Sequence, residues 1–199
     1  ASNVKLASDG RVLRVTLDRP DKRNALRVED CLSLVAAFNE ADLDPQVGAI
    51  LLSASGPDFC AGMDVSEALR DDAPERAAIH EELFTVGGRI TKPIVAAVQG
   101  RALAGGLGIV TNAHVVLAAE DAGFGLVEIR IGLWPFVAYR SVSHAIGERR
   151  ALELSLTGRV IDAQDALHWG LAHYITPPAD LEERSVAIAR TLAGYSPEA

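Results

Sequence analysis

The sequence has few cysteines and no long apolar run, and both shortages narrow the classes of protein to which it can belong. Cys31 and Cys60 are its only two cysteines, too few for a disulfide framework and without the spacing of metal ligands. We therefore expect no metal site. No apolar run approaches the ~20 residues that a membrane span requires, and the first residues lack the apolar h-region of a signal peptide. These absences predict a soluble, cytoplasmic protein that does not act in a membrane.

Positive charge is also scarce. The chain has 19 Lys and Arg residues against 27 Asp and Glu residues, a formal net charge of −8. This balance argues against nucleic acid and anionic membranes as general partners. An anionic ligand would need a local basic patch, and Arg19, Lys22 and Arg23 supply one beside the turn at Asn24.

The chain has 199 residues, of which 49% are hydrophobic, so we expect one domain over residues 1–199 with a sizeable core. Short apolar runs alternate with segments of helical spacing, and this alternation predicts an α/β fold. The predicted strands are Val12–Leu17, Ala49–Ala54, Ile94–Val98, Val115–Ala119 and 123–127. The predicted helices are Val28–Leu43, 65–70, 75–90, 107–113, 138–146, 149–156, 163–169 and 181–192.

Two turns of small residues each connect a predicted strand to a predicted helix. The first covers residues 59–64, and the second, glycine-rich turn covers residues 99–108. Small residues let the backbone approach a ligand closely, and the first amides of a helix have no intrahelical partner. One amide from each turn, aimed at a common oxygen, would form an oxyanion hole. A glycine-rich turn is equally suited to close packing of a helix on a sheet.

A series of motifs in a fixed order makes the chain similar to the enoyl-CoA hydratase/isomerase, or crotonase, superfamily. The resemblance implies a crotonase-like spiral of repeated β-β-α units, with a core over about residues 1–176. The motifs cover residues 17–26, 59–64, 92–108, 118–125, 128–133, 156–159 and 166–171.

The resemblance also bears on the end of the chain and on assembly. Relatives continue past the helical segment 177–199, so the C-terminal helices are expected to be short or missing, either naturally or because a tail is omitted. Relatives are trimers or dimers of trimers, and we expect a homotrimer or hexamer. Apolar positions on the helices over 138–156 and 163–169 exceed what one core-facing stripe needs, which favours an interface.

The resemblance implies roles for individual residues. The backbone N–H groups of Met63 and Gly105 would form the oxyanion hole, and Glu128 would be the catalytic acid/base. No cofactor is expected, because coenzyme A arrives as part of an acyl-CoA substrate. The residues implied in binding substrate or coenzyme A are Lys22, Arg23, Ala25, Ala61, Asp64, Val65, Trp134 and Phe136.

One departure from the family pattern decides between reactions. Hydratases of the family use two glutamates, and one of these positions is Gly108 here. Moving a double bond needs one base, whereas adding water needs two groups, so isomerisation is favoured over hydration. Gly108→Glu should shift the balance towards hydration if the backbone tolerates it. His114 is a candidate replacement for the missing acid, although a structural histidine is the more common case. A non-catalytic acyl-CoA binding protein and an acyl hydrolase are the remaining alternatives.

Overall fold

The computed structural model describes residues 2–68 and 73–195. The elements follow one another as β1 (Val4–Asp9), β2 (Val12–Leu17), η1 (Pro20–Lys22), α1 (Val28–Leu43), β3 (Ala49–Ala54), α2 (Val65–Ala68), α3 (Ala73–Leu83), η2 (Val86–Gly88), β4 (Ile94–Val98), β5 (Arg101–Leu103), α4 (Gly105–Val110), β6 (Val115–Ala119), β7 (Gly123–Gly125), η3 (Glu128–Ile131), α5 (Phe136–Ile146), α6 (Glu148–Thr157), β8 (Ile161–Asp162), α7 (Ala163–His168), β9 (Tyr174–Thr176), η4 (Pro178–Asp180) and α8 (Leu181–Ala193).

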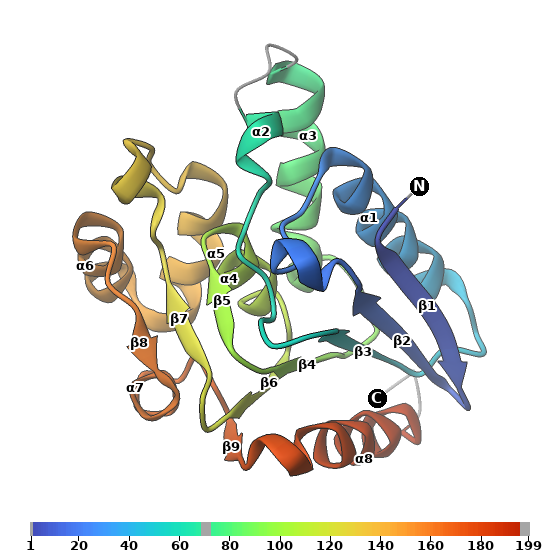
Figure 1. Ribbon diagram of the computed structural model, residues 1–199. Helices are drawn as coiled ribbons and strands as arrows, with labels where there is room; N and C mark the ends of the chain where they lie inside the picture. Colours follow the sequence, from blue (N-terminus) through green and yellow to red (C-terminus); the bar gives the residue numbers. More distant parts are fainter. Residues whose placement is uncertain (1, 69–72, 196–199) are drawn as a thin grey trace.

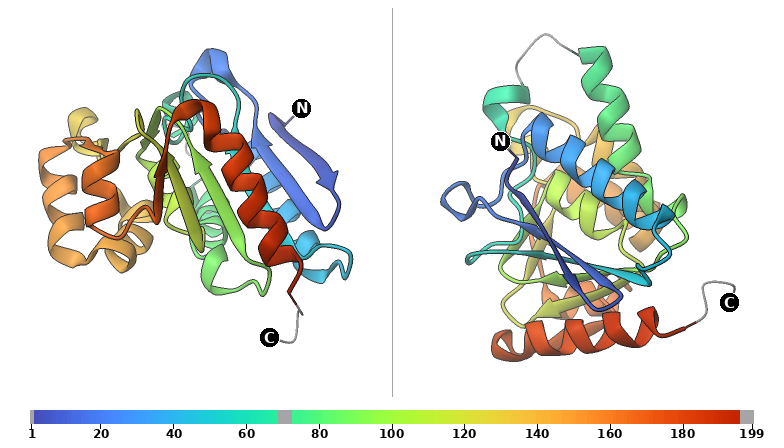
Figure 2. Two further views of the ribbon diagram at one scale, coloured as in Figure 1. Left: turned by 90° about the horizontal axis from the view of Figure 1, so that it is seen from below. Right: turned by 90° about the vertical axis from the view of Figure 1, so that its right-hand side faces the viewer.

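The larger sheet has the strand order β1-β2-β3-β4-β6-β9 and is parallel except for the antiparallel pair β1–β2. Its central strands are apolar on both faces, because both faces are covered. Ile50 and Leu52 point into the main core, whereas Ala49 and Leu51 point towards α8. Figures 1 and 2 show α8 crossing one face of this sheet, with α1 and α3 on the opposite side.

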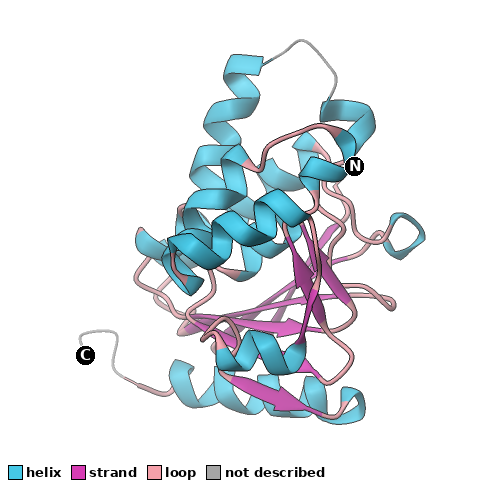
Figure 3. Cartoon of the chain, turned by 90° about the vertical axis from the view of Figure 1, so that its left-hand side faces the viewer, coloured by secondary structure: helices cyan, strands magenta, loops and turns pink. Residues whose placement is uncertain are grey.

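The smaller sheet has the strand order β5-β7-β8 (Figure 1) and accounts for the spiral path of the chain. Figure 3 shows the strands lying between helices on either side. β4 and β6 belong to the larger sheet, whereas the strands that follow them, β5 and β7, pair with each other in the smaller one before the chain enters a helical turn. Two isolated bridges, Leu26 with Met63 and Cys60 with Ala102, extend this pattern to the chain between β2 and α1 and between β3 and α2. The β-β-α unit therefore recurs without a repeat in the sequence, because the second strand of a unit can be a single bridge.

The bounds of β2, β3, β4, β6 and α1 agree with the sequence predictions. The predicted helix over 75–90 is wrong at its end: α3 stops at Leu83, and η2 follows. The side chain of Asn112 causes this break, because its Nδ2 donates to Phe84 O (2.8 Å) and its Oδ1 accepts from Gly87 N (3.1 Å). The helix over 107–113 instead spans Gly105–Val110, and the predicted helix over 65–70 ends outside the described residues. No described helix has the length and apolar character needed to cross a membrane.

Candidate active site

A pocket of about 870 Å³ opens where the second strand of each β-β-α unit ends. Parallel strands present their carboxyl ends at one edge of a sheet, and ligands bind there in many α/β proteins. The lining comes from the turns at Leu26, Met63, Leu103 and Val127 and from α3 and α5. Of the residues singled out from the sequence, the structure brings these together in the lining: Arg23, Ala61, Met63, Asp64, Val65, Gly105, Glu128, Trp134 and Phe136.

Lys22 and Ala25 do not line this pocket, although they belong to the same turn as Arg23. Arg23 and Asn24 both have left-handed backbones, with φ of 50° and 53°, and the chain reverses sharply there. The buried Asn24 side chain stabilises the reversal by accepting from Arg19 N and donating to Ser55 O and Asp58 O. The reversal leaves only Arg23 of the predicted basic patch in the lining.

The two turns of small residues lie against each other, as the sequence predicts. The N–H groups of Met63 and Gly105 donate to no other described residue. A Cβ on Gly62 would lie 3.3 Å from Gly105 N and 2.8 Å from the Cβ of Ala104, so this contact requires glycine. These two N–H groups, in adjacent turns that line the pocket, are the kind of donors that form an oxyanion hole.

Ala104 holds the second turn in a strained conformation. Its φ of 53° and ψ of −125° are typical of glycine, and its N–H donates to Gly125 O at 2.8 Å. The bond to β7 places Gly105 at the first position of α4, where a helix amide has no partner within the helix.

Glu128 also lines the pocket and begins η3, and the strand predicted over 123–127 ends earlier, at Gly125. Its Oε2 is buried and accepts no hydrogen bond from the described residues. Burial raises the pKa of its carboxyl to about 7, and a bond to its own backbone N–H opposes the shift. At neutral pH this carboxyl exists in both protonation states, as an acid/base catalyst requires.

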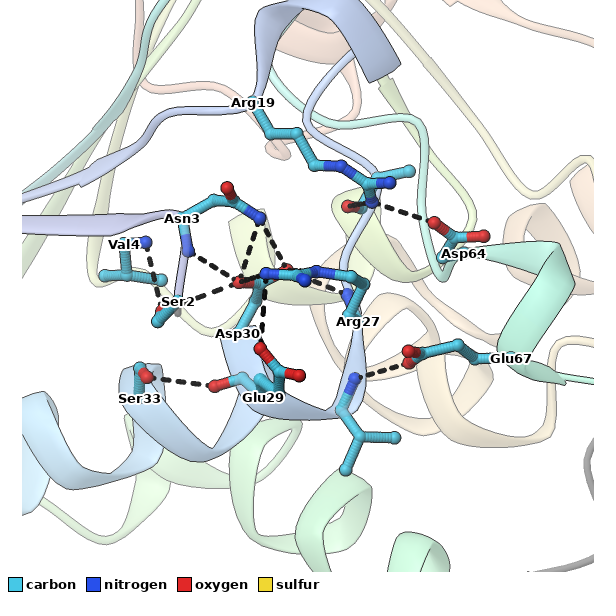
Figure 4. Close-up of polar contacts among 12 residues, drawn as sticks. Ser2, Asn3, Val4, Arg19, Arg27, Glu29, Asp30, Ser33, Asp64 and Glu67 are labelled. Atoms are coloured by element: carbon cyan, nitrogen blue, oxygen red, sulfur yellow. Dashed lines mark hydrogen bonds and ion pairs between the residues drawn. The ribbon is translucent and has the colours of Figure 1, made fainter.

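Polar contacts of two lining carboxylates, Asp64 and Glu67, connect the start of α2 to the N-terminal segments (Figure 4). Asp64 accepts from Ser66 Oγ (2.7 Å) and Arg19 Nη1 (2.8 Å), and these bonds lower the pKa of Asp64 to about 2. Glu67 Oε2 accepts from Val28 N at 2.8 Å, at the start of α1. Both carboxylates therefore position backbone in addition to lining the pocket.

His114, Tyr139 and Phe136 differ in their position relative to the pocket. His114 does not line the pocket: its Nδ1 accepts from Ile94 N (2.9 Å), so its Nε2 donates to Gly87 O (2.8 Å). It is a structural histidine. Tyr139 packs on Trp134 with ring centroids 5.8 Å apart and is outside the lining, whereas Phe136 is at the mouth with 81% of its surface exposed. Over the described ranges, no group of three His, Cys, Asp or Glu residues is arranged to hold a metal ion.

α3 and Phe84, the residue that follows it, contribute to the lining although no sequence motif includes them. Ala77, His80, Glu81 and Phe84 all line the pocket, and none belongs to a motif. A helical pattern identifies an apolar face but does not show that this face borders a cavity, so no signal in the sequence identifies these residues.

The spiral of β-β-α units is the fold that the resemblance to crotonase-like proteins implies. The chain belongs to the enoyl-CoA hydratase/isomerase family, whose model matches residues 8–199.

Individual relatives agree with this assignment. The chain is 35% identical to "Probable enoyl-CoA hydratase echA8" of Mycobacterium bovis, over 98% of this chain and 77% of the relative. It is 31% identical to the mevalonyl-coenzyme A hydratase sidH of Aspergillus fumigatus, over 94% of this chain and 71% of the relative. Among solved structures, an enoyl-CoA hydratase of Mycobacterium smegmatis superimposes with a TM-score of 0.92 at 29% identity, covering 98% of this chain and 78% of its own. The predicted fold class is confirmed.

Proposed function

We propose that this protein is an acyl-CoA thioester enzyme that shifts a double bond, with Glu128 as its acid/base. The observation that carries this proposal is the buried Oε2 of Glu128, which lies at the pocket and has no hydrogen-bond partner among the described residues. A carboxyl with a pKa of about 7 removes and returns protons at neutral pH.

The reaction follows from the two parts of the site. The Glu128 carboxylate removes a proton from the α-carbon of a 3-enoyl thioester, and the electron pair moves onto the thioester oxygen. The N–H groups of Met63 and Gly105 stabilise that oxyanion, an effect typically worth ~10²–10³ in rate for each donor. Protonated Glu128 then returns the proton to the γ-carbon, and the double bond moves next to the carbonyl. No atom is gained or lost.

The other carboxylates of the lining are poorly placed to share this work. Asp64 and Glu67 accept hydrogen bonds from Arg19 and from Val28 N, and the side chain of Glu81 is exposed. Gly108, where the family pattern of hydratases has a second glutamate, offers no carboxyl. Among the carboxylates of the described lining, Glu128 is the one with a buried oxygen that accepts no hydrogen bond from described residues. One such carboxylate favours proton transfer between two carbons over water addition.

Two cations serve the coenzyme A part of the substrate in this proposal. Arg23, in the reversal after β2, and Arg130, in η3, both line the pocket, while the chain as a whole has a net charge of −8. Phosphate groups would therefore be attracted to these guanidinium groups rather than to the general surface.

Hydration of a 2-enoyl thioester is the second candidate, and the names of the relatives favour it, since several are called enoyl-CoA hydratases. The two reactions are separated by supplying 2-enoyl-CoA and 3-enoyl-CoA of equal length and identifying the products by mass. We expect faster isomerisation of the 3-enoyl ester than hydration of the 2-enoyl ester. Hydration at a comparable rate would reject this preference, and release of free acid would indicate an acyl hydrolase.

The role of Glu128 is tested by Glu128→Gln, which keeps the shape of the side chain and removes the base. Turnover should fall by at least ~10², while binding of a non-reactive CoA thioester changes little. Glu153→Gln is the matched control, because Glu153 pairs with Arg159 outside the pocket. Unchanged turnover in Glu128→Gln would reject the assignment. A wild-type protein that binds the thioester and transforms nothing would be a binding protein instead.

A further inference from the structure

The Phe84 side chain is almost fully buried and borders the pocket. Its ring lies across the first turn of α4. A Cβ on Gly108 would lie 2.6 Å from Phe84 Cε1 and 2.7 Å from Cδ1, and a Cβ on Gly105 would lie 3.3 Å from Cζ. The ring thus extends from Gly105, whose N–H group is part of the proposed oxyanion hole, to Gly108, where hydratases of the family have a glutamate.

Hydrogen bonds to the backbone around Phe84 fix the position of its ring. Asn112 Nδ2 donates to both Phe84 O (2.8 Å) and Gly108 O (2.9 Å), so one buried amide ties the end of α3 to α4. The next turn is fixed as well, because Gly87 N donates to Asn112 Oδ1. His80 meets the ring edge-on, with centroids 6.3 Å apart. The ring has little freedom to withdraw from Gly108.

We propose that Phe84 is a specificity-determining residue that keeps water and a second carboxyl away from the acyl chain beside Gly105. A water molecule needs two to four polar partners to occupy a buried position, and an aromatic ring supplies none. The ring also fills the space that a side chain at position 108 would occupy. This inference rests on the proposed function, because it explains how a hydratase-like scaffold suppresses hydration.

The expectation that Gly108→Glu favours hydration requires room for a side chain at position 108, and the structure does not provide it. A side chain there would overlap the Phe84 ring and approach the Cβ of Ala138 at 2.9 Å. The single substitution should therefore damage the fold, and a functional carboxyl at position 108 requires a smaller residue at position 84.

The test compares wild type with Phe84→Ala, Gly108→Glu and the double variant. Thermal unfolding is measured for each, with hydration of a 2-enoyl-CoA and isomerisation of a 3-enoyl-CoA of equal length. We expect Gly108→Glu to lower Tm by several degrees, and the double variant to be more stable than the two single effects predict. The ratio of hydration to isomerisation should rise at least ~10-fold in the double variant, and less in Phe84→Ala.

Phe38→Ala is the matched control, since it also removes a buried ring, from α1 and away from the pocket. It should lower Tm and leave the ratio of products unchanged. The proposal is overturned if the folded double variant keeps the wild-type rate of hydration, or if Gly108→Glu is stable and hydrates without a change at Phe84. A wild-type protein that does not isomerise the 3-enoyl-CoA would reject the proposed function. The role of Phe84 is tested separately, by the rate of hydration in the variants.

Discussion

At the scale of single residues, burial of Glu128 acts on chemistry and on stability at once. The carboxyl of Glu128 has its ordinary pKa of 4.5 in the unfolded chain and a pKa of about 7 in the folded protein. Between these values the folded state holds a proton that the unfolded state has released, so the contribution of Glu128 to the free energy of unfolding falls as pH rises through this window. Ionisation of Glu128 in the folded protein therefore lowers the free energy of unfolding.

Glu128→Gln should consequently be more stable than wild type above about pH 7, by up to a few kcal/mol, and differ little near pH 4. Melting curves at several pH values measure this difference. Glu153→Gln should behave oppositely, because the hydrogen bond from Arg159 lowers the pKa of Glu153 and that stabilisation is present at high pH. Equal pH profiles for wild type and Glu128→Gln would contradict the raised pKa.

At the scale of elements, the oxyanion hole depends on contact between two turns that are 42 residues apart in numbering, at Met63 and Gly105. Gly62→Ala should disturb that contact, because its φ is 103° and the new Cβ would lie 2.8 Å from the Cβ of Ala104. We expect a loss of ~1–3 kcal/mol in the free energy of unfolding and a larger fall in kcat than in substrate affinity.

Urea unfolding and steady-state kinetics measure both effects of Gly62→Ala. Gly10→Ala is the control, since Gly10 also has a positive φ of 60° but no atom within 4 Å of the added Cβ. It should show a loss of stability with no loss of kcat. If both variants keep wild-type kcat, the contact between the turns does not position the amides.

At the scale of the whole molecule, an apolar surface on η3 and the adjacent α6 is exposed: Ile129, Ile131, Leu152 and Leu156 are 39–60% accessible. Such patches usually mark interfaces, and closed cyclic symmetry is the common way to bury them. We predict a homotrimer or hexamer in light scattering at micromolar concentration. Leu156→Asp should weaken it, whereas Leu43→Asp, at an exposed site on α1, should not. A stable wild-type monomer would contradict this prediction.

The sequence by itself determined the elements whose signals are local. Strands β3, β4 and β6 were predicted with their bounds, because strands buried on both faces are continuous apolar runs. The turns around Met63 and Gly105 were predicted from small residues between a strand and a helix, and the position of Glu128 from its motif.

Only the tertiary structure decided what lies around those residues. The end of α3 is set by Asn112, 28 residues after Phe84, and a helical pattern contains no trace of that contact. Contacts of the same kind gave His114 a structural role, placed His80 and Phe84 at the pocket, and left Lys22 outside its lining. The raised pKa of Glu128 likewise comes from burial by distant segments. Local pattern specifies which groups are present, whereas their exposure and partners arise from chain segments that meet only on folding.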